Sequence, residues 1–240
     1  MMKTLIFLFG IFVTLNLSAQ GTINADEIIV MINRGDAVNF KGVKVVGELD
    51  LTNLENRQQE RGNKDSFFSN VEVELTFVNC TFTDDVLAFY CEDYSDRCYR
   101  ADFEKPVTFI DCTFNGETSF KYSLFPEEVV FNNNIFSHEA NFKYSKFRKE
   151  TSFMGCRFQD EANFKYADFS GFVNFHEAAF VEEASFKYAK FPDGAMFSNA
   201  HFYEEVDFKY TKYSGDVIFE GAQFEGEVDQ KYSHILSNRK

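Results

Sequence analysis

A Phe-Lys-Tyr triplet recurs in this 240-residue chain at a fixed interval. It begins at Phe120, Phe142, Phe164, Phe186 and Phe208, and a degenerate copy begins one further step on, at Gln230. In the first turn, we expect Phe40-Lys41-Gly42 to take the same place. Within each repeat the aromatic residues are spaced alternately by five and six positions, which does not follow the period of an α-helix. A fixed period of this kind is typical of a solenoid, in which each repeat packs on the next.

A small or β-branched residue stands two positions before most of the aromatic residues, as Ala140 does before Phe142. Alternate residues of an extended segment point to the same face, so these two side chains point inward while Asn141 points outward. Four such segments make one turn, and the alternation of five and six leaves one extra residue at each of two corners. We therefore expect a β-helix of about nine turns and roughly 40 Å, at ~4.8 Å per turn. The triplet phenylalanines should form one buried column.

The repeat resembles that of the pentapeptide repeat family, which reads roughly Ala-Asp/Asn-Leu/Phe-x-x. The matching pieces are Ala162–Tyr166 (Ala-Asn-Phe-Lys-Tyr), Ala167–Gly171 (Ala-Asp-Phe-Ser-Gly) and Val173–Glu177 (Val-Asn-Phe-His-Glu). The resemblance covers most of the chain after residue 37 and implies an all-β fold, a right-handed quadrilateral parallel β-helix. The six-residue steps depart from the family pattern and predict small bulges at two corners. Phenylalanine where leucine is common predicts a wider core of stacked rings.

Residues 1–19 are typical of an export signal peptide. Lys3 supplies the charged start, an apolar run extends from Leu5 to Leu17, and a small-residue cleavage site ends at Ala19. The apolar run is short for crossing a bilayer, so no membrane span is predicted. The mature protein should begin near Gln20 and work in the periplasm or outside the cell.

Residues 20–37 are expected to contain a short capping helix. Asn24 and Glu27 resemble a capping box, an apolar face follows, and Gly35 is placed as a C-terminal stop. A β-helix leaves the strand edges at its end unpaired, and we expect this helix to cover that end. The alternative is that the helix binds a partner.

The β-helix is expected over residues 38–235, followed by a tail at 236–240, and it is interrupted twice. The first interruption is a polar loop at about 55–70. The second is an insertion at about 83–97, because the motif that begins at Leu75 recurs at Val107, a longer interval than the repeat. The insertion holds five carboxylates and could bind a cation, although it lacks the spacing of a calcium loop. A plain surface excursion is the alternative.

Five cysteines in an exported chain suggest disulfide pairing. Cys91 and Cys98 bracket a short acidic segment and could staple the insertion. Cys80 and Cys112 occupy the same inward site on successive turns, about 4.8 Å apart by strand spacing. That distance permits a disulfide, but buried free thiols are the simpler interpretation, and Cys156 should also be buried.

No catalytic or cofactor-binding pattern is present in the sequence. The four histidines have neither metal-ligand spacing nor a common repeat position, and there is no Gly-rich phosphate loop or nucleophile elbow. The formal net charge of −14 argues against nucleic acid as a partner. We therefore expect a non-enzymatic protein without a metal or cofactor.

Positions one repeat apart should stack on neighbouring turns, so the repeat arranges surface residues in columns. A glutamate column comprises Glu117, Glu139, Glu161, Glu183, Glu205 and Glu227. Columns of lysine and tyrosine lie beside one another at Lys121, Tyr122, Lys143, Tyr144, Lys165, Tyr166, Lys187, Tyr188, Lys209 and Tyr210, and the copy at Gln230 adds Lys231 and Tyr232. Adjacent columns of opposite charge and stacked rings could simply stabilise the rod.

Two functional hypotheses stand beside this structural one. In the first, the lysine and tyrosine columns, with Lys146, Lys190 and Lys212 nearby, bind an unknown protein or polysaccharide as an adhesive stripe. In the second, the acidic rod mimics DNA, as the topoisomerase-protecting members of the pentapeptide repeat family do. Mimicry needs a cytoplasmic target, so the predicted export signal disfavours it.

Overall fold

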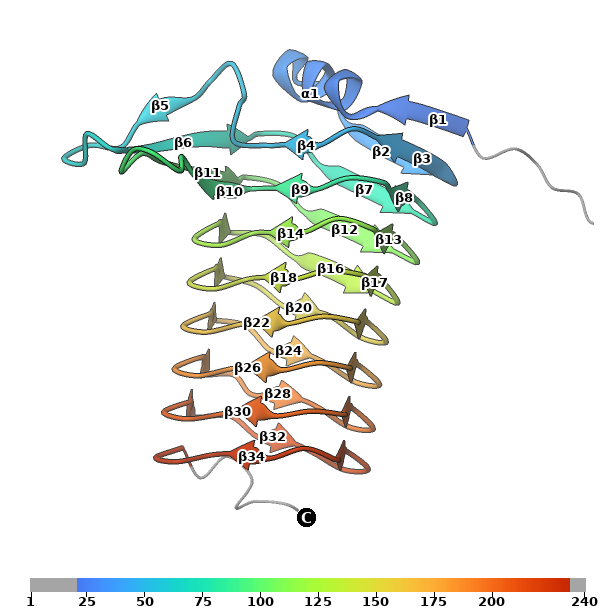
Figure 1. Ribbon diagram of the computed structural model, residues 1–240, viewed down its shortest axis with the longest axis vertical. Coiled ribbons are helices and arrows are strands. Elements are labelled where there is room, and N and C mark those ends of the chain that lie inside the picture. Colours follow the sequence, from blue (N-terminus) through green and yellow to red (C-terminus); the bar gives the residue numbers. More distant parts are fainter. Residues whose placement is uncertain (1–20, 234–240) are drawn as a thin grey trace, which may run out of the picture.

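The computed structural model describes residues 21–233 (Figure 1). The predicted export signal, the expected start at Gln20 and the tail at 236–240 lie outside the described residues. The described chain winds into a right-handed parallel β-helix with four faces, and the sheets run along the length of the rod. The predicted fold class is confirmed.

Three faces extend from the first turn to the last. The first face contains β2 (Val38–Lys41), β7 (Leu75–Val78), β12 (Val107–Ile110), β16 (Val129–Asn132), β20 (Thr151–Ser152), β24 (Val173–Asn174), β28 (Ala195–Met196) and β32 (Val217–Ile218). The second contains β1 (Gly21–Asn24), β3 (Val43–Val46), β8 (Thr81–Phe82), β13 (Thr113–Phe114), β17 (Ile135–Phe136), β21 (Arg157–Phe158), β25 (Ala179–Phe180), β29 (His201–Phe202) and β33 (Gln223–Phe224). The third contains β4 (Leu49–Asp50), β9 (Val86–Leu87), β14 (Thr118–Ser119), β18 (Ala140–Asn141), β22 (Ala162–Asn163), β26 (Ala184–Ser185), β30 (Val206–Asp207) and β34 (Val228–Asp229).

The fourth face is regular only from the third turn onward. It contains β15 (Leu124–Phe125), β19 (Lys146–Phe147), β23 (Asp168–Phe169), β27 (Lys190–Phe191) and β31 (Lys212–Tyr213). Before these strands, the chain forms two hairpins that pair with each other in the order β10-β11-β6-β5. Their strands are β5 (Gln58–Gln59), β6 (Ser66–Val71), β10 (Phe89–Cys91) and β11 (Cys98–Phe103). This four-stranded sheet and its loops, here called the wing, project sideways from the rod (Figure 1).

The wing corrects the predicted interruptions. The predicted polar loop at 55–70 contains the β5–β6 hairpin, and the insertion predicted at 83–97 begins later, because β9 is an ordinary strand paired with β4 and β14. β6 and β11 run parallel and re-enter the fourth face, where the rings of Phe103 and Phe125 stack at 4.6 Å. The rest of both hairpins, including β5 and β10, contributes no residue to the common core, and this is why the core periodicity did not reveal them.

The core consists of stacked phenylalanine rings. Successive centroids in the triplet column, from Phe120 to Phe208, lie 5.4, 5.0, 5.1 and 5.2 Å apart, and all five side chains are fully buried. Rings of neighbouring columns meet edge to face, as Phe142 and Phe153 do at 5.1 Å. These are the two geometries that aromatic pairs prefer, and the predicted core column is present.

Each five-residue corner requires one residue in the left-handed backbone region. The φ angle is 62° at Tyr144 and 66° at Gly155, which mark the two such corners of one turn. The inward residue that follows is small, and where it is polar it can bond a core carbonyl: the Ser145 hydroxyl donates to the Phe120 carbonyl oxygen at 2.6 Å. At the equivalent positions of the next two turns, Ala167 and Ala189, a methyl group fills the same buried site.

The first-turn alignment of Phe40-Lys41-Gly42 with the triplet is wrong. Phe40 lies on the first face and stacks on Phe77 at 5.9 Å, whereas the triplet position of that turn is Leu51, whose N–H donates to the Leu87 carbonyl. At both five-residue corners, a residue with left-handed backbone stands two positions after an inward aromatic. Gly42, with φ 67°, therefore has the same spacing and conformation as the tyrosines of the other corner, and this similarity explains the wrong alignment.

Helix α1 (Ala25–Arg34) lies at the N-terminal end of the rod, as expected (Figure 1). The Glu27 carboxylate accepts hydrogen bonds from the backbone N–H of Asn24 at 3.3 Å and from its side-chain amide at 3.1 Å. Ile28 and Ile32 are buried in the common core, and Gly35 closes the helix with φ 77°. The strand β1, which sequence patterns did not predict, precedes the helix and pairs with β3.

We expect Phe164→Ala to lower the free energy of unfolding by about 3–5 kcal/mol, because it opens a cavity between stacked rings. Lys165→Ala, one position later on the surface, should change it by about 0.5 kcal/mol or less. Denaturant titration followed by circular dichroism measures both. Equal effects of the two substitutions would contradict the assignment of Phe164 to the core.

Candidate functional site

The tyrosine column forms a continuous stack of rings along one corner of the rod. From Tyr122 to Tyr232, successive ring centroids lie 4.8, 4.6, 4.7, 4.6 and 4.9 Å apart. Every tyrosine in the stack has a positive φ between 57° and 64°. Because each ring covers the face of the next, the ring edges and hydroxyl groups form the outer surface.

This stack has a structural role that is independent of any ligand. A left-handed conformation costs a non-glycine residue about 1–2 kcal/mol, and a stacked aromatic pair returns about 0.5–1.5 kcal/mol. The Tyr144 N–H also donates to the Lys165 carbonyl of the next turn at 2.9 Å. The column therefore offsets the backbone strain at its own corner.

The lysine column lies against the tyrosine rings. The Nζ atom lies 5.4 Å from the ring centroid in the pair Lys143–Tyr144 and 5.8 Å in Lys187–Tyr188, within the range of a cation–π contact. Burial, followed by the charge of Lys143, lowers the pKa of Lys121. Lys209 differs, because its Nζ bonds Asp229 at 2.9 Å and Asp207 at 3.4 Å. The predicted lysine and tyrosine residues are thus brought together, although Lys209 is engaged by carboxylates.

A groove of about 900 Å³ runs along the other side of the tyrosine column. Its wall consists of four stacked tyrosines, Tyr122, Tyr144, Tyr166 and Tyr188. Its floor is the outer surface of the fourth face, and the wing forms its N-terminal end. Lys146 and Lys190 line this floor, whereas the lysine column lies outside the groove. Lys212 occupies the position equivalent to Lys190 on the next strand of the fourth face, β31.

The floor of the groove is basic. Asp168 Oδ2 lies 3.5 Å from Lys190 Nζ and 3.6 Å from Arg148 Nη1, and Lys146 occupies the neighbouring strand position. Two of these three cations, Arg148 and Lys190, therefore share one carboxylate. In a chain with a net charge of −14, this is a local reversal of sign.

The N-terminal end of the groove is acidic. Arg100 bonds Glu60 at 3.1 Å and Asp102 at 3.2 Å, and Asp65 and Asp96 line the same end. Burial raises the pKa of Asp102, while Arg100 and the Leu124 N–H oppose that rise. A hydrogen bond from Ser66 lowers the pKa of Glu60, and the charge of Lys146 contributes to the same effect. The basic floor and the acidic end therefore interact electrostatically.

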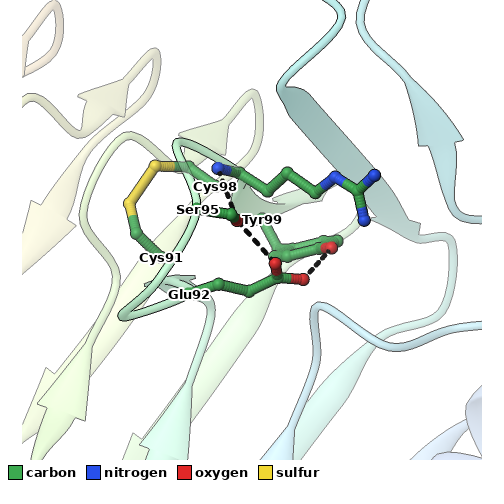
Figure 2. Close-up of a disulfide and its surroundings, with 6 residues drawn as sticks. Cys91, Glu92, Ser95, Cys98 and Tyr99 are labelled. Carbon is green, nitrogen blue, oxygen red and sulfur yellow. Dashed lines mark hydrogen bonds between the residues drawn. A yellow bond between two sulfur atoms is a disulfide. The ribbon is translucent and has the colours of Figure 1, made fainter.

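A disulfide between Cys91 and Cys98 joins opposed residues of the β10–β11 hairpin (Figure 2). Inside the hairpin turn, Glu92 accepts hydrogen bonds from the Ser95 hydroxyl at 2.6 Å and from the Tyr99 hydroxyl at 2.5 Å. These two bonds lower the pKa of Glu92. The disulfide and the carboxylate together fix the shape of the wing where it borders the groove.

Cys80, Cys112 and Cys156 are buried free thiols, the simpler of the two sequence interpretations. The Cys112 thiol lies 3.4 Å from the Phe77 carbonyl oxygen, and burial raises the pKa of Cys156. Among the residues described, no group of three or more His, Cys, Asp or Glu is placed to hold a metal ion.

The glutamate column lies at the opposite edge of the third face from the lysine column. Burial, and then the charges of Glu161 and Glu117, raise the pKa of Glu139, so the stacked carboxylates repel one another. Glu139 in turn opposes the lowering of the Lys121 pKa. The attraction between the two columns across the face therefore offsets part of the repulsion within each column.

A family model described as pentapeptide repeats, with nine copies, matches residues 99–146, 142–190, 164–212 and 186–229. No curated protein and no solved structure matched the chain. None of the helices in the described part of the chain is long and apolar enough to span a membrane.

We expect Glu139→Gln to stabilise the protein at pH 7, by about 0.5 kcal/mol or less. A carboxyl group whose pKa is raised by folding stabilises the folded state while protonated, and this contribution is lost as pH rises through the folded-state pKa. The gain should therefore vanish below about pH 4, where unfolded glutamate is also protonated. Glutamine keeps the oxygen that accepts from Asn141 at 2.9 Å.

Thermal unfolding of the parent and the Glu139→Gln variant across this pH range measures the effect. The matched control is Glu220→Gln, at an exposed glutamate outside the column. A gain that is independent of pH, or equal in both variants, would refute repulsion within the column.

Proposed function

This chain belongs to the pentapeptide repeat family, and on that premise we propose that it is an exported, non-enzymatic scaffold that binds an extended partner along its tyrosine column. The observation that carries the proposal is the row of tyrosine edges with cations on both sides. Lys143 and Lys187 lie on one side of the row, and Lys146 and Lys190 lie on the other.

Two features support export. Residues 1–19 have the charge, apolar run and cleavage site of a secretory signal. The Cys91–Cys98 disulfide is of a kind that persists in oxidising compartments and is rare in the cytosol. Both features also weigh against the DNA-mimic hypothesis, which needs a cytoplasmic target.

The geometry of the row suits an extended partner. Side chains repeated at each turn offer the same weak contact many times, so affinity comes from the number of contacts engaged together. Tyrosine provides apolar area with a hydroxyl group, and lysine provides charge that salt screens. A linear partner exploits such a row better than a compact small molecule does.

We expect the mature protein from its native host to begin at or near Gln20. N-terminal mass spectrometry of the cell-envelope and culture fractions measures this start. An intact Met1 in cytosolic protein would overturn export and return the DNA-mimic hypothesis to consideration.

We expect the triple variant Lys143→Gln, Lys165→Gln and Lys187→Gln to bind its partner about tenfold more weakly or worse, because it removes three successive cations from the row. Purified mature protein is sedimented with the insoluble envelope material of its host, at low and high salt. The control carries Lys41→Gln, Lys44→Gln and Lys105→Gln, which make the same change in charge outside the column. Equal sedimentation of the two variants would refute the row as the binding surface.

A further inference from the structure

We propose that the groove binds one end of a linear acidic polysaccharide, with the chain along the tyrosine wall and its terminal sugar against the wing. This inference rests on the proposed function and names its ligand. It is carried by three features of the groove: the direction of its floor strands, which run across it, the obstruction of the row by the wing, and the change of charge from floor to end.

The floor of the groove offers side chains, and not unpaired backbone groups, to a ligand. β19, β23 and β27 each pair with a strand on both sides along the rod, and β15 and β31 are the end strands of this sheet. A peptide lying along the groove would cross these strands and could not add to the sheet as a further strand, which is one source of affinity for an extended segment. A glycan needs no such pairing, because its hydroxyl and carboxylate groups bond to side chains.

The basic floor selects an acidic glycan. Lys146, Arg148 and Lys190 line the groove, and Asp168 is the shared counter-charge of Arg148 and Lys190. Arg148 also donates to the Ser170 hydroxyl at 2.9 Å, which fixes its guanidinium over the floor. Uronate carboxylates along the chain would bond these cations, since guanidinium and ammonium groups form charge-assisted hydrogen bonds with carboxylates.

The wing obstructs the row at its N-terminal end. The ring of Phe89, on β10, contacts Tyr122 with a centroid distance of 5.3 Å, and Lys121 Nζ lies 4.5 Å from the Phe89 centroid. The wing extends well beyond the corner loops of the later turns (Figure 1). A polymer that follows the tyrosine column therefore meets the wing and cannot continue past it.

The change of charge determines what is accepted at that end. Glu60, Asp65, Asp96 and Asp102 stand there with Arg100, so a uronate carboxylate would be repelled. The hydroxyl groups of a terminal sugar can donate to these carboxylates. The groove is thus complementary to a chain end with free hydroxyl groups, followed by acidic units over the floor.

The test uses hyaluronan oligomers that end in a neutral N-acetylglucosamine, in three lengths, the longest four times the shortest, titrated by calorimetry into the mature protein. End binding predicts one protein per chain at every length, with an affinity that stops rising once the groove is filled. Neutral maltodextrins of the same lengths should bind at least tenfold more weakly. The variant Lys146→Gln with Lys190→Gln should also lose about tenfold in affinity at every length, whereas Lys44→Gln, on another face, should leave it unchanged.

Each contrary result refutes a separate step. A number of proteins per chain that grows with length would exclude end recognition but leave the acidic ligand standing. Unchanged affinity of the Lys146 and Lys190 variant would remove the groove as the site. No binding of any oligomer at low salt would remove the acidic polysaccharide, while the envelope sedimentation experiment would still decide the proposed function by itself.

Discussion

The hydrogen-bond register between successive turns is the constraint on which the rest of the structure depends. Each strand of the later turns pairs in parallel with its equivalent one repeat on, as Ala140 does with Ala162 and Ala162 with Ala184. Backbone pairing holds the turns at the separation of neighbouring strands, ~4.8 Å. That distance is also suitable for stacking aromatic rings, and the phenylalanine columns follow from it. Backbone and side chains therefore favour the same spacing, and a slip in register would break both at once.

The same register determines what the surface can be. One residue per five-residue corner must take the left-handed conformation, and at one corner this residue is tyrosine throughout the later turns. Its ring stacks on the ring of the next turn, so the fold itself produces a column of tyrosines. The fold does not require cations beside the column, because one position of the fourth face holds Asp168 on one strand and Lys190 and Lys212 on the next two. This variation of charge between turns distinguishes the floor of the groove from a purely structural column, in which every turn carries the same residue.

The regular part of the molecule was predictable because every core position obeys one rule. The spacing of Phe142 and its equivalents predicted the four faces, the core column and the surface columns. The wing was not predictable by that rule, because most of its length lies beyond the core, to which only the ends of β6 and β11 return, at Val71 and Phe103. The groove depends on the wing and could not be predicted without it, although the repeat places Lys146 and Lys190 near the tyrosine column. The disulfide could be inferred, since Cys91 and Cys98 are close in sequence and their hairpin places them opposite one another.

A solenoid that repeats without interruption has a uniform surface, and a uniform surface cannot tell one position along a polymer from another. Direction and position require a break in the repeat. Here the two breaks fall on successive turns, and their hairpins pair through β6 and β11, so they reinforce one another instead of disturbing the rod separately. They also bring Arg100 and Asp102 to the start of a face that later carries Lys146, Arg148 and Lys190. The irregular turns therefore give the rod a polarity, from an acidic corner to a basic floor, that the repeat alone could not provide.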